Sequence, residues 1–212
     1  MKAIFEGLCP NCGGSISDER LSLGLPCSSC LPEVPKAIME GLRRGPREEL
    51  QIRVKSLLER RKKLKRYGEV ARIAEDVVKF NELFLKAVGN RLWSAQKEWA
   101  RRVFKGVSFP ITAPTGLGKT VFGILMGIYL AREKNYKSYM VFPGHVLVEQ
   151  ALEKAEHFIE ELGLNGIRVI GYHAKMGKKR KEEFFSKLES GDFDVVMTSA
   201  RFLQVNFERL SK

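Results

Sequence analysis

The chain has 212 residues, of which 44% are hydrophobic, and a formal net charge of +12. This length and composition predict one main domain with a sizeable core and room for a small appendage. The longest uncharged apolar run, from Val121 to Ala131, is too short to cross a bilayer, and no signal-peptide core follows Met1-Lys2-Ala3. We therefore expect a cytoplasmic protein without a membrane partner.

All four cysteines lie near the N-terminus, in two Cys-x₂-Cys pairs. Two such pairs in an intracellular protein predict Zn²⁺ held by four thiolates. Disulfides are the competing interpretation, but the expected compartment opposes them. A segment this short has few apolar contacts, so we expect the metal to supply its folding energy. The predicted ligands, in a zinc-ribbon module over residues 1–34, are Cys9, Cys12, Cys27 and Cys30.

A basic, helical region is expected next, over residues 35–89. Segment 43–66 contains eleven basic and three acidic residues, a net charge of +8. Such density commonly marks a nucleic-acid partner, although a solvated helix face is the alternative. Apolar residues recur at helical spacing from Pro46 to Arg66, Gly68 is expected to break that helix, and a second helix is expected to end near Gly89. We expect a helical hairpin that links the zinc module to the main domain.

Beyond Leu92 the pattern changes to alternating helices and short apolar strands. Such strands are typical of a parallel sheet whose two faces are both covered by helices, so residues 90–212 are predicted to form a doubly wound α/β domain. Pro110 cannot donate to a sheet ladder and should lie at a strand's start. The expected elements are helix 95–104, strand 109–112, helix 119–133, strand 138–142, helix 145–162, strand 167–171, helix 178–189, strand 193–198 and helix 200–210.

A glycine-bearing turn over residues 113–120, Ala-Pro-Thr-Gly-Leu-Gly-Lys-Thr, opens directly into a predicted helix. Such a turn points backbone N–H groups at one spot, where Lys119 adds a positive charge and the Thr120 hydroxyl can hold Mg²⁺. This arrangement predicts a nucleoside triphosphate site, with an accidental surface turn as the alternative. The candidate contacts are Ala113, Pro114, Thr115, Gly116, Leu117, Gly118, Lys119 and Thr120, of which Lys119 and Thr120 are the candidate catalytic residues.

Two further loops follow predicted strands. Residues 144–147 and 198–202 both place small polar residues at a helix start, where free N–H groups can accept the phosphates of a nucleic acid. Ordinary helix capping would look much the same. Ligands of such sheets bind beyond the carboxyl ends of the strands, so these loops and the phosphate loop are expected to share one edge.

These motifs together resemble the first RecA-like domain of superfamily 2 helicases. Residues 113–120 look like motif I, Pro143 to Gln150 like motif Ia, and Thr198 to Leu203 like motif Ib. Leu92-Trp93-Ser94-x-Gln96 resembles the region that recognises adenine. The resemblance implies ATP with Mg²⁺ as ligand, DNA or RNA as partner, and a role for the Gln96 amide in reading the adenine edge.

The combination with an N-terminal four-cysteine module and a helical linker resembles the start of the reverse gyrases, over nearly the whole chain. That family joins a helicase-like half to a type IA topoisomerase half and uses ATP to introduce positive supercoils into DNA. The resemblance implies zinc and ATP as cofactors, DNA as partner, and the remaining halves as intramolecular partners. Another zinc-containing superfamily 2 helicase and a non-catalytic nucleic-acid-binding zinc module are the alternatives.

A helicase core also needs an acidic pair after an apolar strand, to hold Mg²⁺, and an arginine from a second RecA-like domain. Neither feature is found. Asp192 and Asp194 precede their predicted strand, and the chain ends near Lys212, about where the strand with the acidic pair should begin. We expect a fragment truncated before that strand, which binds ATP weakly and is not competent for hydrolysis or strand passage.

Overall fold

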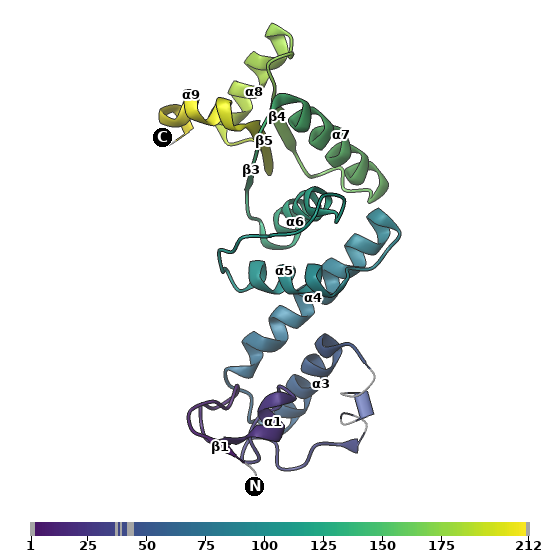
Figure 1. The fold of residues 1–212 in the computed structure, drawn as a ribbon, viewed down its shortest axis with the longest axis vertical. Helices are drawn as coiled ribbons and strands as arrows, with labels where there is room; N and C mark the ends of the chain where they lie inside the picture. Colours follow the sequence, from purple (N-terminus) through teal and green to yellow (C-terminus); the bar gives the residue numbers. More distant parts are fainter. Residues whose placement is uncertain (1–2, 37, 39, 42–44, 211–212) are drawn as a thin grey trace. The chain divides into compact units, whose positions relative to one another are not determined.

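The computed structural model describes residues 3–36, 38, 40–41 and 45–210, which fold into two compact units (Figure 1). Unit 1 comprises residues 1–81 and 93–109, and unit 2 comprises residues 82–92 and 110–212. The cations Arg43 and Arg44 of the basic segment lie outside the described residues, as do both chain ends. The domain boundaries after residues 34 and 89 stay predictions, and the two units are considered separately below.

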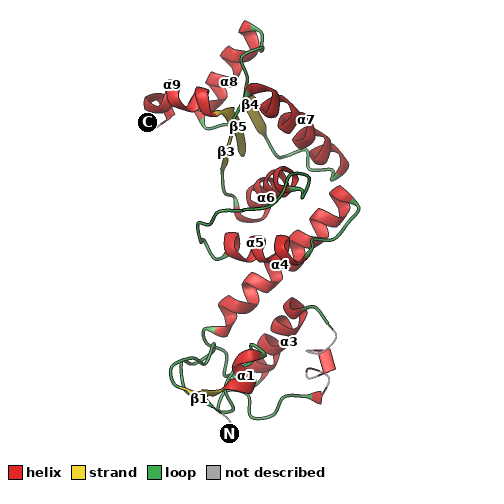
Figure 2. Ribbon diagram, in the orientation of Figure 1, coloured by secondary structure: helices red, strands yellow, loops and turns green. Residues whose placement is uncertain are grey.

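Unit 1 contains a small hairpin and several helices (Figure 2). Strand β1 pairs antiparallel with β2, which leads directly into α1. Helices α3 and α4 run as a helical hairpin, in which Lys55 Nζ on α3 lies 2.9 Å from Glu75 Oε1 on α4. The bounds are β1 (Ile4–Phe5), β2 (Ile16–Ser17), α1 (Asp18–Ser22), α3 (Arg47–Arg60), α4 (Tyr67–Val88), which continues into unit 2, and α5 (Ser94–Phe104).

One hydrophobic cluster joins the cysteine module to the helical hairpin within unit 1. Leu25 and Leu31 of the module lie in the same cluster as Val54 and Leu58 of α3, and all four are almost fully buried. The cysteine module therefore does not have to form a core alone, because α3 supplies an apolar face on which it packs.

The break between the two helices falls earlier than the sequence predicted. Gly68 lies inside the first turn of α4, and α3 ends at Arg60, where the following backbone turns out of the helix. Lys62 has a φ of +55°, a left-handed conformation that ends a helix and that glycine would adopt more readily. The prediction that Gly68 breaks the helix was wrong because a left-handed lysine was not expected to act as the terminator.

Unit 2 contains a parallel three-stranded sheet in the order β3-β5-β4. Its helices and strands follow the predicted order, and most ends lie close to the predicted ones. The bounds are α6 (Lys119–Lys134), β3 (Ser138–Phe142), α7 (His145–Glu161), β4 (Val169–Tyr172), α8 (Lys178–Ser190), β5 (Val195–Ser199) and α9 (Ala200–Leu210).

Helices cover both faces of this sheet, as predicted. Met140, Met197 and Gly171 are register partners and so share one face. Glycines allow α6 and α7 to approach it closely, since a Cβ on Gly127 of α6 would meet Met140 Cε at 2.7 Å and a Cβ on Gly171 would meet Leu152 of α7 at 2.5 Å. The opposite face carries Ile170 and Val196, which pack in one buried cluster with Phe184 of α8 and Phe202 of α9.

The predicted strand 109–112 does not form. These residues precede the phosphate loop without a ladder partner in the described part of the chain. Pro110 has no N–H to donate, and β3 pairs on one side only, with β5. A short apolar run becomes a strand only when a neighbouring strand accepts its hydrogen bonds, and none is present beside it.

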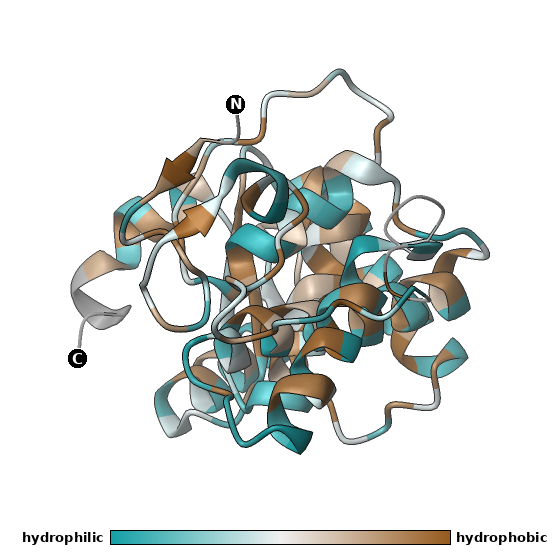
Figure 3. Cartoon of the chain, turned by 90° about the horizontal axis from the view of Figure 1, so that it is seen from below, coloured by the Kyte–Doolittle hydropathy of each residue, from teal (hydrophilic) through white to brown (hydrophobic). Residues whose placement is uncertain are grey.

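Brown and teal residues alternate along most helices in Figure 3, which reflects one apolar and one polar face. No helix within the described ranges is long and apolar enough to cross a membrane.

Candidate zinc centre and nucleotide site

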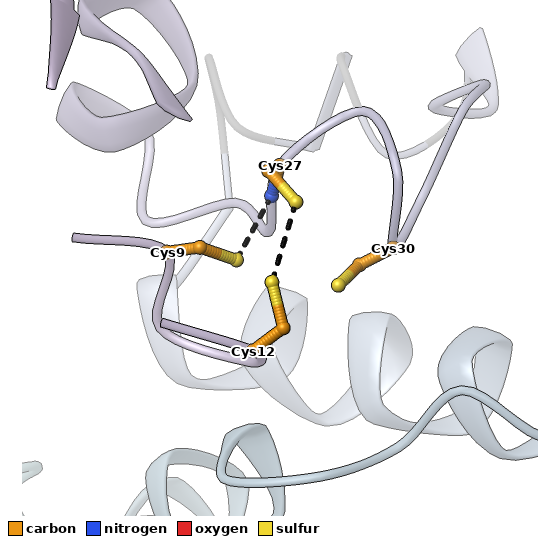
Figure 4. A group of neighbouring side chains, drawn as sticks. All are labelled: Cys9, Cys12, Cys27 and Cys30. Carbon is orange, nitrogen blue, oxygen red and sulfur yellow. Dashed lines mark hydrogen bonds between the residues drawn. The ribbon is translucent and has the colours of Figure 1, made fainter. Parts of the chain in front are cut away.

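The four cysteines converge although the segment 13–26 separates the two pairs in the sequence. Their Sγ atoms all lie within 4.8 Å of one another, and those of Cys12 and Cys27 are 3.6 Å apart (Figure 4). A Zn–S distance of about 2.3 Å in a tetrahedron gives sulfur atoms about 3.8 Å apart. The separation is far longer than a disulfide bond, and all four cysteines are free thiols. The geometry fits a metal centre and excludes the disulfide alternative.

Backbone N–H groups already support negative charge on this cluster. The Cys27 N–H donates to Cys9 Sγ over 3.2 Å, and the Gly14 N–H donates to Cys12 Sγ over 3.3 Å. Burial would raise the pKa of the Cys9 thiol, but N–H groups of Cys12, Cys27 and Asn11 outweigh it and lower the pKa to about 6. Burial raises the pKa of Cys30 instead. Thiolates are the form that binds zinc, so the N–H groups favour metal binding.

Asn11, between the first two cysteines, is a structural residue that the sequence reasoning missed. Its side chain is fully buried, donates from Nδ2 to the Lys63 carbonyl over 2.8 Å and accepts from the Lys65 N–H over 2.8 Å. Its own carbonyl accepts from the Arg66 N–H over 3.1 Å. The asparagine in Cys-Pro-Asn-Cys was the only signal, and its partners lie in a distant segment of the chain, beyond the reach of local patterns.

The phosphate loop has the backbone shape that its glycines suggest. Gly116 and Gly118 have φ values of +85° and +74°, in the left-handed region that favours glycine, and Gly118 is the N-cap of α6. Lys119 is the first residue of that helix, and its Nζ donates to the carbonyls of Ala113 over 2.5 Å and Pro114 over 2.7 Å. The ammonium group thus lies within the loop, on two carbonyl oxygens.

This arrangement can bind a triphosphate at little cost in reorganisation. The first N–H groups of α6 have no partner within the helix and carry the positive end of its dipole. A phosphate placed there would give Lys119 a charged acceptor in place of neutral carbonyls, which makes a stronger hydrogen bond. Thr120 follows on the exposed side of the first turn, where a hydroxyl can reach Mg²⁺.

Gln96 is nearly fully buried in α5, and its Oε1 accepts the Trp93 N–H over 3.3 Å. This hydrogen bond caps the start of α5. Gln96 belongs to unit 1 and the phosphate loop to unit 2, so each is placed only within its own unit.

The loops after β3, β4 and β5 meet at one edge of the sheet. Phe142 is the register partner of Ser199, and Tyr172 is that of Thr198, so the carboxyl ends of the three strands are aligned. Gly144 is the N-cap of α7, and Ser199 Oγ accepts the Phe202 N–H over 3.2 Å at the start of α9. The structure therefore brings 144–147 and 198–202 together. It also shows that Ser199 acts as a helix cap.

The acidic residues before β5 serve the opposite edge. Asp194 accepts from the Arg168 backbone N–H over 2.8 Å and from its guanidinium over 3.1 Å, and Arg168 also pairs with Asp192. The hydrogen bond from Arg168 outweighs burial and holds the pKa of Asp194 below its usual range. These carboxylates tie β4 to β5 and lie at the amino end of the strands, away from the loops above.

Together, the cysteine cluster and the phosphate loop on a helix-covered parallel sheet define a nucleotide-binding α/β protein with a zinc module. Residues 93–212 match the DEAD/DEAH box helicase family, and the chain belongs to that family. Residues 1–48 match the reverse gyrase zinc finger family. The resemblances seen in the sequence are thereby confirmed, with zinc as the metal and ATP with Mg²⁺ as the ligands of the helicase family.

Curated relatives extend the match over the whole chain. The reverse gyrase of Pyrococcus horikoshii is 42% identical over 212 residues, that of Pyrococcus furiosus is 40% identical, and reverse gyrase 1 of Aquifex aeolicus is 39% identical. All three alignments cover 100% of this chain but only 12%, 17% and 16% of the respective relative. The chain therefore spans less than a fifth of their length.

Proposed function

We propose that this chain is the N-terminal region of a cytoplasmic, ATP-dependent DNA topoisomerase of the reverse gyrase type, which introduces positive supercoils. The supporting observation is the occurrence, in one chain, of a reverse gyrase zinc finger match over residues 1–48 and a helicase match over residues 93–212. The remaining helicase and topoisomerase parts would be its intramolecular partners, and DNA its substrate.

The residue roles in this proposal follow from the geometry. Cys9, Cys12, Cys27 and Cys30 are the zinc ligands. Residues 113–120 hold the triphosphate, with Lys119 on the phosphates and Thr120 on Mg²⁺. Gln96 reads adenine, which requires its capping hydrogen bond to Trp93 to open or be shared. Residues 144–147 and 198–202 contact nucleic-acid phosphates at the common edge of the sheet.

Nucleotide binding by Lys119 is the most direct experiment. Titration calorimetry of the chain with Mg-ATP should show binding that Lys119→Ala weakens at least about tenfold, since a charge-assisted contact contributes about 1.5–3 kcal/mol. Lys154→Ala, on the exposed surface of α7, is the matched control and should bind as the parent does. Equal affinity in the parent and Lys119→Ala would contradict the assignment.

We further propose that the chain alone hydrolyses ATP very slowly. The strands β3, β4 and β5 are followed by Pro-Gly-His, His-Ala-Lys and Ala-Arg-Phe, so none supplies the carboxylate pair that fixes Mg²⁺ and water. Steady-state assays should find a turnover rate well below that of a complete helicase core. A rate equal to that of a complete core would overturn this point.

The topoisomerase assignment needs a different assay from the nucleotide site. A polypeptide of the relatives' full length that begins with this chain should convert relaxed plasmid into positively supercoiled plasmid with ATP, and Lys119→Ala should abolish that product. Unwinding of duplexes without any change in linking number would favour another zinc-containing helicase.

A further inference from the structure

A dense group of cations lies at the turn between α3 and α4. Six of the seven residues from 60 to 66 are basic and all six are exposed, and we call this group the basic turn. In the described part of the chain, no carboxylate forms an ion pair with any of them, whereas Lys55, one turn earlier, pairs with Glu59 and Glu75. Its members are Arg60, Arg61, Lys62, Lys63, Lys65 and Arg66.

The backbone of the basic turn is fixed, in spite of its exposure. The Lys62 N–H donates to the Glu59 carbonyl and the Lys63 N–H to the Leu58 carbonyl, both over 2.8 Å, which is a Schellman ending for α3. The left-handed position in that motif is usually glycine, yet here it is Lys62, with a φ of +55°. A lysine held in a strained conformation suggests that its charge has a use.

The basic turn is also held against the zinc module. Buried Asn11 bonds to the Lys63 carbonyl and the Lys65 N–H through its side chain, and to the Arg66 N–H through its carbonyl. Lys63 Nζ donates to the carbonyl of Ser29, between the second pair of cysteines, over 2.7 Å. Both cysteine pairs thus hold the turn, so metal binding that orders them also fixes the spacing of the cations.

We propose that the basic turn is a phosphate-backbone contact for duplex DNA, positioned by the zinc centre through Asn11. In this view the cysteine pairs act as a clamp, and the cations lie on the segment they clamp. The proposal rests on the DNA partner of the proposed function and deepens it by naming the contacting residues. Fixed cations without neighbouring carboxylates are suited to phosphates, whose contacts carry affinity but little sequence preference.

The first test removes charge from the turn. Fluorescence anisotropy with a short labelled duplex should show the triple variant Arg61→Ala, Lys62→Ala, Lys65→Ala binding at least about tenfold more weakly at low salt, because each lost contact lowers the salt slope by about 0.9. The matched control, Lys178→Ala, Lys179→Ala, Arg180→Ala, removes the same charge from the exposed start of α8 and should lose much less affinity.

The second test separates positioning from charge. Asn11→Ala keeps every cation but releases two of the bonds that hold the turn, so it should lower both the affinity and the salt slope while zinc content stays at one per chain. Asn90→Ala, on an exposed asparagine of unit 2, is its control and should match the parent. Zinc content guards against misfolding, because a variant that has lost its metal would fail that check.

A third variant opposes stability and binding. Lys62→Gly relieves the left-handed strain, so its thermal midpoint should be equal to or above that of the parent while its DNA affinity falls several-fold. Asn135→Gly, at the other left-handed non-glycine position, should behave alike in stability and leave DNA binding unchanged.

Two outcomes would overturn the inference, and they are distinguishable. If the parent binds no duplex at all, the DNA partner itself fails together with the inference. If the parent binds duplex but the turn variants match the α8 control, only the inference fails, and the turn then serves an acidic protein segment.

Discussion

The zinc centre and the phosphate loop achieve their geometry in opposite ways. The cysteine cluster is assembled from two distant pairs, and it depends on Asn11, on the basic turn and on a core shared with α3. The phosphate loop is one contiguous segment, shaped by Gly116 and Gly118, whose lysine is bound to the loop's own carbonyls. The first site therefore supports the fold around it, whereas the second depends on the sheet and helices behind it.

Metal removal should give the largest effect and would break this comparison most sharply. Zinc contributes about 10–16 kcal/mol to small zinc modules, so a chelator should expose the backbone amides of residues 1–34 and α3 to hydrogen exchange. The amides of β3, β5 and α6 should stay protected. The check is exchange mass spectrometry with and without chelator.

Cys27→Ser should give the same exchange pattern without a chelator, and Ser28→Ala, one residue away and exposed, should give the parent's pattern. If α6 and the sheet lose protection together with residues 1–34, the two sites do not differ in the proposed way.

A glycine substitution in the sheet tests the other side. Gly171→Ala would place a Cβ 2.5–2.9 Å from three atoms of Leu152, so it should destabilise unit 2 by about 1–3 kcal/mol and leave zinc content unchanged. Denaturant unfolding followed by a unit 2 probe measures the effect. Gly166→Ala meets nothing within 4 Å and should stay near the parent, so equal losses in both variants would refute the packing argument.

The smallest expected effect concerns pH. Arg168 holds the pKa of Asp194 below its usual range, so the folded value lies below the unfolded value of about 3.9. The resulting stabilisation is present above that unfolded value and is lost as the pH falls through the folded value. Asp194→Asn should therefore cost about 1 kcal/mol or less at neutral pH and nothing once the carboxyl is protonated.

Thermal unfolding at several pH values checks this point, with Glu182→Gln, an exposed residue of α8, as control. A pH-independent difference between Asp194→Asn and the parent would show that the carboxylate charge is not the cause.

Local patterns carried most of the prediction. The alternation of apolar and polar residues gave β3 and the starts of α6, α7 and α8, because each depends on contacts a few residues apart. The spacing of the cysteines indicated the metal, and the glycines indicated the turn before α6. These signals are short-range, and short-range geometry is what a sequence encodes directly.

The misses have long-range causes. Residues 109–112 are apolar enough for a strand but have no neighbour to pair with in the part of the chain that the structure describes. Asn11 is bonded to residues beyond position 60, and the left-handed Lys62 ends α3 where a glycine was expected to do so further on. Each outcome depends on which segment lies alongside, which composition and periodicity do not contain.

The central claim is that the loop at 113–120 receives a triphosphate through Lys119. A crystal structure of the chain with Mg²⁺ and a non-hydrolysable ATP analogue tests it most directly. The account predicts that Lys119 Nζ leaves the Ala113 and Pro114 carbonyls and bonds to phosphate oxygens, with Thr120 on the metal. A nucleotide bound elsewhere, or Lys119 still on both carbonyls with nucleotide in the loop, would contradict it.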